Sequence, residues 1–167
     1  MLLTPEYIFA GVERITPEFL AQKGITALAL DVDNTLTSHD SQHLPPQVQG
    51  WLETMHAAGI RMFIVSNNHE PRVAPFAGRL GLDFVADAAK PLPKGLRRLQ
   101  AAFDVPKSQL ALVGDQLFTD RLAGTFFGVP VFVVKPLAPE TKWFIKFKRV
   151  LEKPFMRRYY KKGGTLL

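Results

Sequence analysis

The stretch ITALALDVDNTLT, residues 25–37, decides the fold. Its apolar first half predicts a short strand that is buried on both faces of a sheet. Asp31 and Asp33 follow the apolar run, and Asn34 and Thr35 then begin a turn. Side chains two apart on an extended chain point the same way, so we expect the two carboxylates to converge at the strand tip. Like charges this close need a positive partner, which predicts a divalent cation and a phosphate-bearing substrate.

The rest of the chain alternates between predicted strands and predicted helices. Turn residues separate the elements, and a helix such as the one after Thr16 begins with Pro17 in its first turn. Besides the first strand, strands are predicted at residues 60–65, 82–86, 110–113 and 129–134, and helices at 15–23, from Pro45 to the stop at Gly59, and at 70–80, 93–103 and 116–127. This alternation predicts an α/β fold, in which a central parallel sheet carries helices on both faces.

Composition excludes some classes of protein and divides the chain by charge. Without cysteine there is no disulfide framework and no thiolate metal site. The N-terminus lacks a basic leader, and no apolar run reaches the ~18 residues of a membrane span, so we expect a cytoplasmic protein.

Of the net charge of +6, residues 142–162 carry nine Lys or Arg against one Glu, whereas residues 1–141 carry twelve against fourteen acids. We therefore expect one domain over residues 1–139 and a basic aromatic helix and tail over 140–167, suited to a polyanionic surface.

Polar side chains follow several of the predicted strands. Ser66 and Asn67 follow the second strand, Asp115 follows a later one, and Lys90 lies in a loop between them. The carboxyl ends of parallel strands share one edge of a sheet, so these groups should gather there. Ser66 can alternatively cap the next helix, and Lys94 competes with Lys90, although Lys90 precedes a proline and so favours an extended loop. Carboxylates, a hydroxyl and an ammonium together suit phosphoryl transfer with Mg²⁺.

Four segments resemble, in order, the motifs of the haloacid-dehalogenase-like (HAD) superfamily. They are Asp31-Val32-Asp33-Asn34-Thr35-Leu36-Thr37, then Ser66, then Lys90-Pro91, and then Gly114-Asp115-Gln116-Leu117-Phe118-Thr119-Asp120. The first and fourth segments are specific, and the resemblance covers about residues 26–130. It implies a three-layer Rossmann-like core and a phosphatase, because a second Asp at position 33 is similar to the phosphatases and not to the dehalogenases.

The resemblance also implies a role for each matching residue. Asp31 would be the nucleophile that forms an aspartyl phosphate, and Asp33 would be the general acid and base. Mg²⁺ would be held by Asp31, by the backbone carbonyl of Asp33 and by Asp115. The remaining residues would bind phosphate (Ser66, Asn67 and Lys90) or support the site (Thr35 and Asp120).

Motif spacing and motif detail narrow the expected substrate. Residues 37–66 and 67–90 each leave room for about one helix and one strand, so no cap domain fits and the site should be open. Ser-Asn-Asn and Gly-Asp-Gln-Leu-Phe-Thr-Asp resemble the subfamily IIIA branch called YqeG-type, which is related to phosphatidylglycerophosphate phosphatases. This implies phosphatidylglycerophosphate, a lipid-borne phosphomonoester, as a candidate substrate. Two alternatives stay open: a phosphatase for soluble nucleotide or sugar phosphates, and a non-catalytic module that binds RNA or protein through its basic tail.

The C-terminal segment has an amphipathic pattern of its own. Five residues form one apolar stripe of a predicted helix that ends at Pro154. They are Trp143, Phe144, Phe147, Val150 and Leu151. Basic side chains surround the stripe, so residues 142–162 suit peripheral contact with an anionic membrane at its inner face. The alternative is that the stripe packs on the domain and the cations are solvated, and nucleic acid is a weaker candidate partner.

Overall fold

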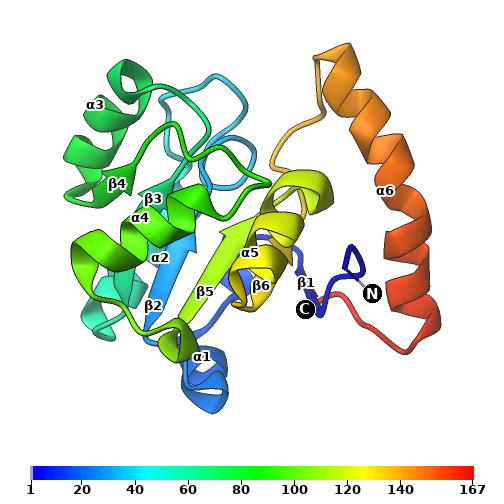
Figure 1. Ribbon diagram of the computed structural model, residues 1–167, viewed down its shortest axis with the longest axis horizontal. Helices are drawn as coiled ribbons and strands as arrows, with labels where there is room; N and C mark the ends of the chain where they lie inside the picture. The colour runs from blue at the N-terminus through cyan, green and yellow to red at the C-terminus, as the bar shows by residue number, and fades with distance from the viewer. Residues whose placement is uncertain (1) are drawn as a thin grey trace.

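A computed structural model describes residues 2–167, and its centre is a parallel sheet of six strands (Figure 1). The strands lie in the order β1-β6-β5-β2-β3-β4, and every neighbouring pair is parallel. Their bounds are β1 Tyr7–Phe9, β2 Ala27–Leu30, β3 Arg61–Val65, β4 Asp83–Val85, β5 Leu110–Gly114 and β6 Val131–Val134. The sheet predicted from the alternating pattern is confirmed, and the predicted strand before Asp31 is β2, in the middle of the sheet.

Six α-helices connect and flank these strands. Their bounds are α1 Pro17–Lys23, α2 Pro46–Ala57, α3 Glu70–Leu80, α4 Lys94–Phe103, α5 Leu122–Phe127 and α6 Trp143–Lys161. Local signals set several of these ends. The Thr16 hydroxyl accepts a hydrogen bond from the Phe19 amide at 3.1 Å, and α1 stops at Gly24, whose φ is +68°.

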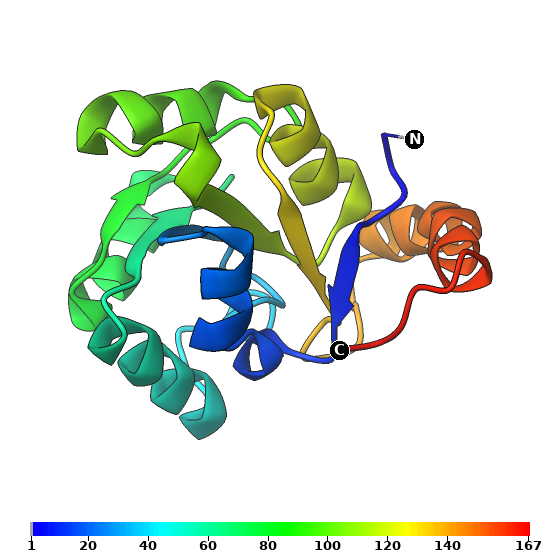
Figure 2. The ribbon, with the colours of Figure 1, turned by 90° about the horizontal axis from the view of Figure 1, so that it is seen from below.

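The alternation of side chains along β2 explains why helices cover both faces. Leu28 and Leu30 lie in the core beneath α1, α2 and α3, whereas Ala27 and Ala29 lie in the core beneath α4 and α5. All four residues are at most 1% exposed, as expected for a strand in the middle of a parallel sheet. The result is the three-layer Rossmann-like arrangement seen end-on in Figure 2.

The connections of the sheet leave no room for a cap domain. Between β2 and β3 the chain forms one loop and α2, and between β3 and α4 it forms only α3 and β4. Within residues 2–167, therefore, the carboxyl edge of the sheet is not covered by an inserted domain, as the motif spacing predicts.

Two local differences from the sequence expectations concern short elements. β1 was not expected, because three residues carry too little periodicity to be read locally; the strand forms by pairing with β6. The helix expected over residues 116–127 begins as a π-helical turn, Leu117–Arg121, before continuing as α5. Such turns are often found at functional sites.

The predicted end of the last helix at Pro154 is wrong, because α6 continues to Lys161. A proline removes one backbone hydrogen bond, which usually interrupts a helix. Here α6 is held on both sides of Pro154, by buried Glu152 before it and by buried Tyr159 after it. The Tyr159 side chain joins the core beneath α4 and α5, and its hydroxyl donates to the Thr165 carbonyl at 2.7 Å.

The C-terminal end is attached to the edge of the sheet. The Leu167 amide donates to the Ile8 carbonyl at 2.9 Å, and the Ala10 amide donates to the Leu167 carbonyl at 2.8 Å. α6 consequently stands beside the β1 edge in both ribbon views (Figure 1, Figure 2). The basic segment of the sequence thus forms a helix next to the sheet.

Candidate active site

The site forms where the two central strands end side by side. β2 and β5 are paired through Leu30 and Val113, and the Asp31 amide donates to the Val113 carbonyl at 2.9 Å. Asp31 and Asp115 follow these strand ends, and both are buried. The Thr35 hydroxyl lies 3.4 Å from Asp31 Oδ2 and 3.5 Å from Asp115 Oδ1, so it bridges the two carboxylates. Residues 84 positions apart in the chain thereby form one acidic pocket.

Lys90 enters this pocket from the loop after β4. Its ammonium donates to Asp31 Oδ1 and to Asp120 Oδ1, each at 2.7 Å, and its side chain is 3% exposed. Asn67 holds the Lys90 backbone with both ends of its amide, at 2.7 and 2.9 Å. Lys94, the competing candidate, is exposed. Lys90 is therefore the lysine that the fold brings to Asp31, and Asn67 fixes the loop that carries it.

Three carboxylates of the pocket lie close enough together to hold a metal ion. Asp31, Asp115 and Asp120 each offer one oxygen, and these oxygens lie within 4.8 Å of one another. Burial raises the pKa of Asp31 to about 7, against the opposing effect of Lys90, and burial also raises the pKa of Asp115 well above its ordinary value. Both pKa shifts reflect the cost of burying negative charge in this pocket. Because all donors are hard oxygens, the donor set fits Mg²⁺.

The side chain of Asp33 departs from the expected convergence with Asp31. Asp33 Oδ1 accepts hydrogen bonds from Arg72 at 2.9 Å and from the Asp40 amide at 3.0 Å, while Oδ2 accepts from Asn68 at 2.6 Å. The physical reason is that β2 ends at Leu30, so the two-residue alternation of a strand no longer applies. Asp33 lies instead at the rim of the pocket, and its catalytic and metal roles stay predictions.

Ser66 lies at the end of β3 and is 2% exposed. Its hydroxyl accepts a hydrogen bond from the Asn68 amide at 3.1 Å, which stabilises the loop that leads into α3. The contact lies within the loop and is not a helix cap: the N-cap residue of α3 is His69, and no side chain caps that helix, so the alternative that Ser66 caps it is wrong. Binding of phosphate by Ser66 and by Asn67 stays a prediction.

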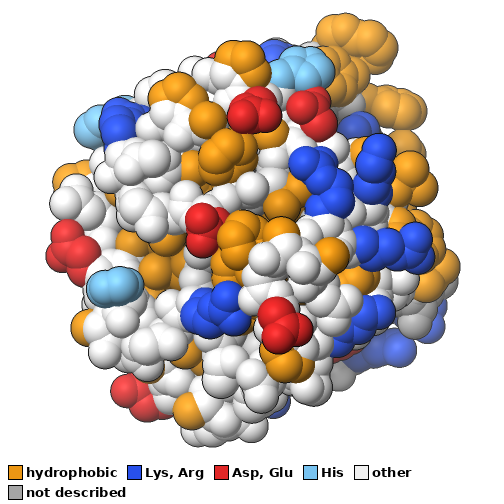
Figure 3. Space-filling model, turned by 60° about the vertical axis from the view of Figure 1, so that its left-hand side comes forward, with side chains coloured by type: hydrophobic (Ala, Val, Ile, Leu, Met, Phe, Trp, Pro, Cys, Tyr) orange, Lys and Arg blue, Asp and Glu red, His pale blue; other side chains and the backbone are white. Residues whose placement is uncertain are grey.

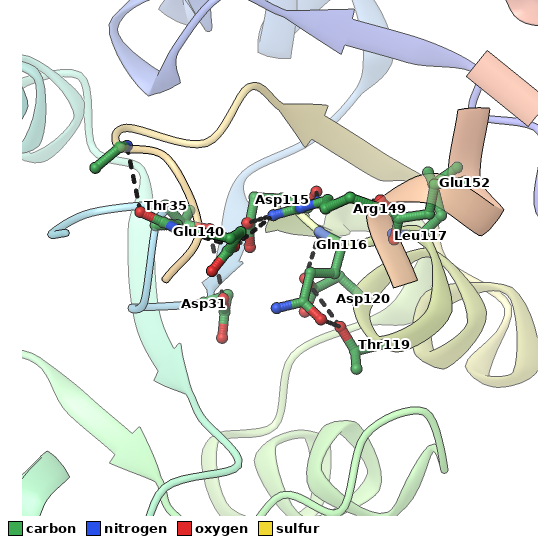
Figure 4. A network of polar contacts seen from close by, with 12 residues as sticks. Asp31, Thr35, Asp115, Gln116, Leu117, Thr119, Asp120, Glu140, Arg149 and Glu152 are labelled. Carbon is green, nitrogen blue, oxygen red and sulfur yellow. Dashed lines mark hydrogen bonds and ion pairs between the residues drawn. The ribbon is translucent and has the colours of Figure 1, made fainter. Parts of the chain in front are cut away.

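Sequence reasoning missed a cation that α6 delivers to the pocket. Arg149 donates to the carboxylate and to the backbone carbonyl of Asp115 (Figure 4). It also donates to Glu152 Oε2 at 3.1 Å and to Glu140 Oε1 at 3.2 Å. In the sequence, Arg149 is one of nine basic residues between 142 and 162. Its spacing of three from Glu152 on a helix was the only local signal that set it apart.

The glycine of the fourth motif leaves space for Asp120. A Cβ at Gly114 would lie 2.2 Å from Asp120 Cγ. Asp120 does not move aside easily, because it accepts hydrogen bonds from Lys90 and from the Gln116 amide. We expect Gly114→Ala to lower the free energy of unfolding by about 1–3 kcal/mol, as overpacking does. Chemical denaturation monitored by circular dichroism measures this change.

Gly78→Ala is the matched control for that substitution. Gly78 lies within α3, and a Cβ added there meets no atom within 4 Å. Since alanine favours a helix over glycine, this variant should be more stable by about 1 kcal/mol. Equal effects of the two substitutions would contradict the close packing of Gly114 against Asp120.

Buried carboxylates and a lysine at the carboxyl edge of a parallel α/β sheet are suited to hydrolysis of phosphate esters. The chain belongs to the haloacid dehalogenase-like hydrolase family, whose model matches residues 17–128. It is accordingly a phosphatase of the HAD type, as the order of its four motifs predicts.

Named relatives agree with this assignment, and a solved structure shares the fold. The chain is 33% identical over 159 residues to the "Probable phosphatase YqeG" of Bacillus subtilis strain 168, covering 95% of this chain and 92% of that protein. It is 27% identical to "Phosphatidylglycerophosphate phosphatase 1, chloroplastic" of Chlamydomonas reinhardtii, covering 95% of this chain but only 62% of that protein. A crystal structure of a hydrolase from Streptococcus pneumoniae TIGR4 superposes with a TM-score of 0.55 at 15% identity, over 77% of this chain and 99% of that one. The last likeness concerns the fold alone.

Proposed function

We propose that this protein is a Mg²⁺-dependent phosphomonoesterase that works through an aspartyl phosphate on Asp31, and that its substrate is phosphatidylglycerophosphate. The observation that carries the proposal is the buried cluster of Asp31, Asp115 and Asp120, in which the Lys90 ammonium contacts Asp31 and Asp120. A nucleophilic carboxylate beside an ammonium, at the edge where sheets of this class bind ligands, suits phosphoryl transfer.

The proposed reaction uses Asp31 and Asp33 in the roles that the resemblance to the HAD motifs implies. A carboxylate oxygen of Asp31 attacks phosphorus, the bond from phosphorus to the ester oxygen breaks, and Asp33 donates its proton to that oxygen. Water then attacks phosphorus while Asp33 accepts a proton from it. The bond to Asp31 breaks, which releases inorganic phosphate and restores both carboxyl groups. Asp33 reaches the leaving oxygen by turning its side chain away from Arg72 and Asn68.

The remaining groups of the site hold the phosphate and offset its negative charge. The Lys90 ammonium holds phosphate oxygens as negative charge shifts between them. Asp31, Asp115 and Asp120 would hold Mg²⁺, which when bound offsets the repulsion between an anionic nucleophile and an anionic ester. Asn67 keeps Lys90 in place through two hydrogen bonds to its backbone.

The exposed face of α6 supports a lipid-borne substrate. Trp143 is 79% exposed and Phe147 is 59% exposed, and their apolar neighbours on the stripe are exposed as well. The buried apolar side chains of α6 are instead Ile145 and Tyr159, which argues against the alternative that the stripe packs on the domain. No α-helix within residues 2–167 is long and apolar enough to cross a bilayer.

Basic side chains accompany this exposed stripe. Residues 142–162 contain nine Lys or Arg. On the face drawn in Figure 3, Lys and Arg side chains gather toward the right-hand margin, where hydrophobic side chains are also exposed. Apolar side chains beside cations match the interface of an anionic bilayer, where the apolar groups enter and the cations meet the headgroups.

A substrate comparison tests the proposal with Mg²⁺ present. Phosphatidylglycerophosphate in phosphatidylglycerol–phosphatidylcholine vesicles should be hydrolysed with a higher kcat/KM than p-nitrophenyl phosphate, a nucleotide or a sugar phosphate. Phe147→Ser should lower the rate on vesicles about tenfold, since burying a phenylalanine is worth roughly 1.5 kcal/mol or more. The same variant should leave the rate on p-nitrophenyl phosphate unchanged.

Phe126→Ser is the matched control, because Phe126 is 50% exposed on α5 rather than on α6. It should behave like the unaltered protein on both substrates. A preference for nucleotide or sugar phosphates would remove the lipid substrate and leave the phosphatase. Release of no phosphate from any ester, together with tight RNA binding, would favour the non-catalytic module instead.

A further inference from the structure

The strongest unassigned feature of the molecule is the contact between α6 and Asp115. Arg149 is the only residue of α6 that reaches a carboxylate of the Asp31–Asp115–Asp120 cluster in residues 2–167, and it does so with its guanidinium (Figure 4). Arg149 lies outside the four motifs, and no step of the proposed reaction uses its contact with Asp115.

The two oxygens of Asp115 have separate partners. Arg149 holds Oδ2, whereas Oδ1 is the oxygen that shares the Thr35 hydroxyl with Asp31. The arginine therefore fixes the rotation of the Asp115 side chain and leaves Oδ1 facing Asp31. It also donates to the backbone carbonyl of Asp115, so both parts of that residue are restrained.

Two further carboxylates keep Arg149 in this place. Glu152 accepts from Arg149 at 3.1 Å and from the Leu117 amide at 2.7 Å, at the start of the π-helical turn after Asp115. Glu140 accepts from Arg149 at 3.2 Å and from the Asn34 side chain at 2.9 Å. Through these pairs α6 is connected to the first and the fourth motif at once.

We propose that Arg149 is a positioning residue for the metal site, and that α6 is an integral part of that site. Arg149 orients Asp115 so that Oδ1 is available to a divalent cation together with Asp31 and Asp120. This inference rests on the proposed Mg²⁺ dependence and adds the residue that sets the affinity for the cation. Groups that hydrogen-bond to a metal ligand typically change metal affinity by about 10- to 100-fold when removed.

A different role for Arg149 predicts a change in metal affinity of the opposite sign. If Arg149 only neutralised Asp115 in place of the metal, it would compete with the cation, and its removal would tighten metal binding. A positioning role predicts weaker binding, even though removal of a positive charge by itself favours a cation. The sign of the change therefore separates the two roles.

The experiment measures binding of Mg²⁺, and of Mn²⁺ as a second probe, to the full chain without substrate by isothermal titration calorimetry. Arg149→Met should raise the dissociation constant about 10- to 100-fold. Arg149→Lys should lie between the two proteins, because lysine keeps the charge but not the planar fork that reaches several acceptors. Arg97→Met is the matched control, since Arg97 is an exposed arginine of α4, and it should bind like the unaltered protein.

The metal affinity of Arg149→Met decides whether Arg149 has a positioning role. Equal or tighter binding by Arg149→Met, with circular dichroism like that of the unaltered protein, would overturn the positioning role while leaving the metal-dependent function in place. If the unaltered protein binds neither metal, the proposed function fails and this inference fails with it. If Arg149→Met does not fold, Glu152→Gln tests the same geometry, because it weakens the hold on Arg149; unchanged metal affinity in that variant would also overturn the inference.

Discussion

Asp31→Asn is expected to reduce phosphate release by on the order of 10⁴-fold or more. An amide cannot form the acyl phosphate, so the covalent route is lost. The amide has almost the same shape as the carboxyl group, and the Lys90 ammonium keeps its second partner, Asp120. The variant should therefore fold, and the loss should appear in kcat measured with saturating Mg²⁺ and p-nitrophenyl phosphate.

Asp83→Asn provides the comparison for that measurement. Asp83 is exposed at the amino end of β4, whereas the site lies at the carboxyl edge of the sheet. The same chemical change there should leave kcat unaltered. Activity of Asp31→Asn within tenfold of the unaltered protein would show that the nucleophile is another group, and the assignment carried over from the first motif would be wrong.

Lys90→Met is expected to lower the free energy of unfolding by about 3–5 kcal/mol and to abolish phosphatase activity. The substitution leaves Asp31 and Asp120 buried without the cation that both contact, and an uncompensated buried charge costs about this much. Added Mg²⁺ should recover part of the lost stability, because it supplies positive charge to the same carboxylates. Urea denaturation with and without Mg²⁺ measures both effects.

Lys94→Met is the matched control, because it removes an exposed lysine four residues further along the same part of the chain. Its stability should stay within about 0.5 kcal/mol of that of the unaltered protein, as is usual for exposed positions. Equal stability of the two variants would contradict the buried ion pairs described for Lys90, and would return Lys94 to consideration as the phosphate-binding lysine.

Local sequence patterns were sufficient for most of the fold. Buried apolar runs such as residues 27–30 mark strands, and Thr16 and Gly24 mark the ends of a helix through their own hydrogen-bonding and backbone preferences. The spacing between the motifs likewise excluded a cap domain, since chain length alone limits what can be inserted. These are properties of neighbouring residues, and they can therefore be recognised without the tertiary structure.

Contacts between distant residues account for what the patterns missed. β1 exists because it pairs with β6, more than a hundred residues away, and α6 passes Pro154 because Glu152 and Tyr159 are buried against the domain. A prediction from local sequence considers only that three residues are short for a strand and that proline disfavours a helix. Packing decided both cases against the local preference.

The sequence by itself determined the parallel sheet and the residue types at its carboxyl edge, because strand burial and turn chemistry depend on neighbours in the chain. Only the tertiary structure decided where those side chains point: Asp33 toward Arg72, and Arg149 of α6 onto Asp115. The reason is that an ion pair depends on burial and on distance in space, and the arginines of a basic segment cannot be told apart locally until the fold brings distant carboxylates such as Asp115 close to one of them.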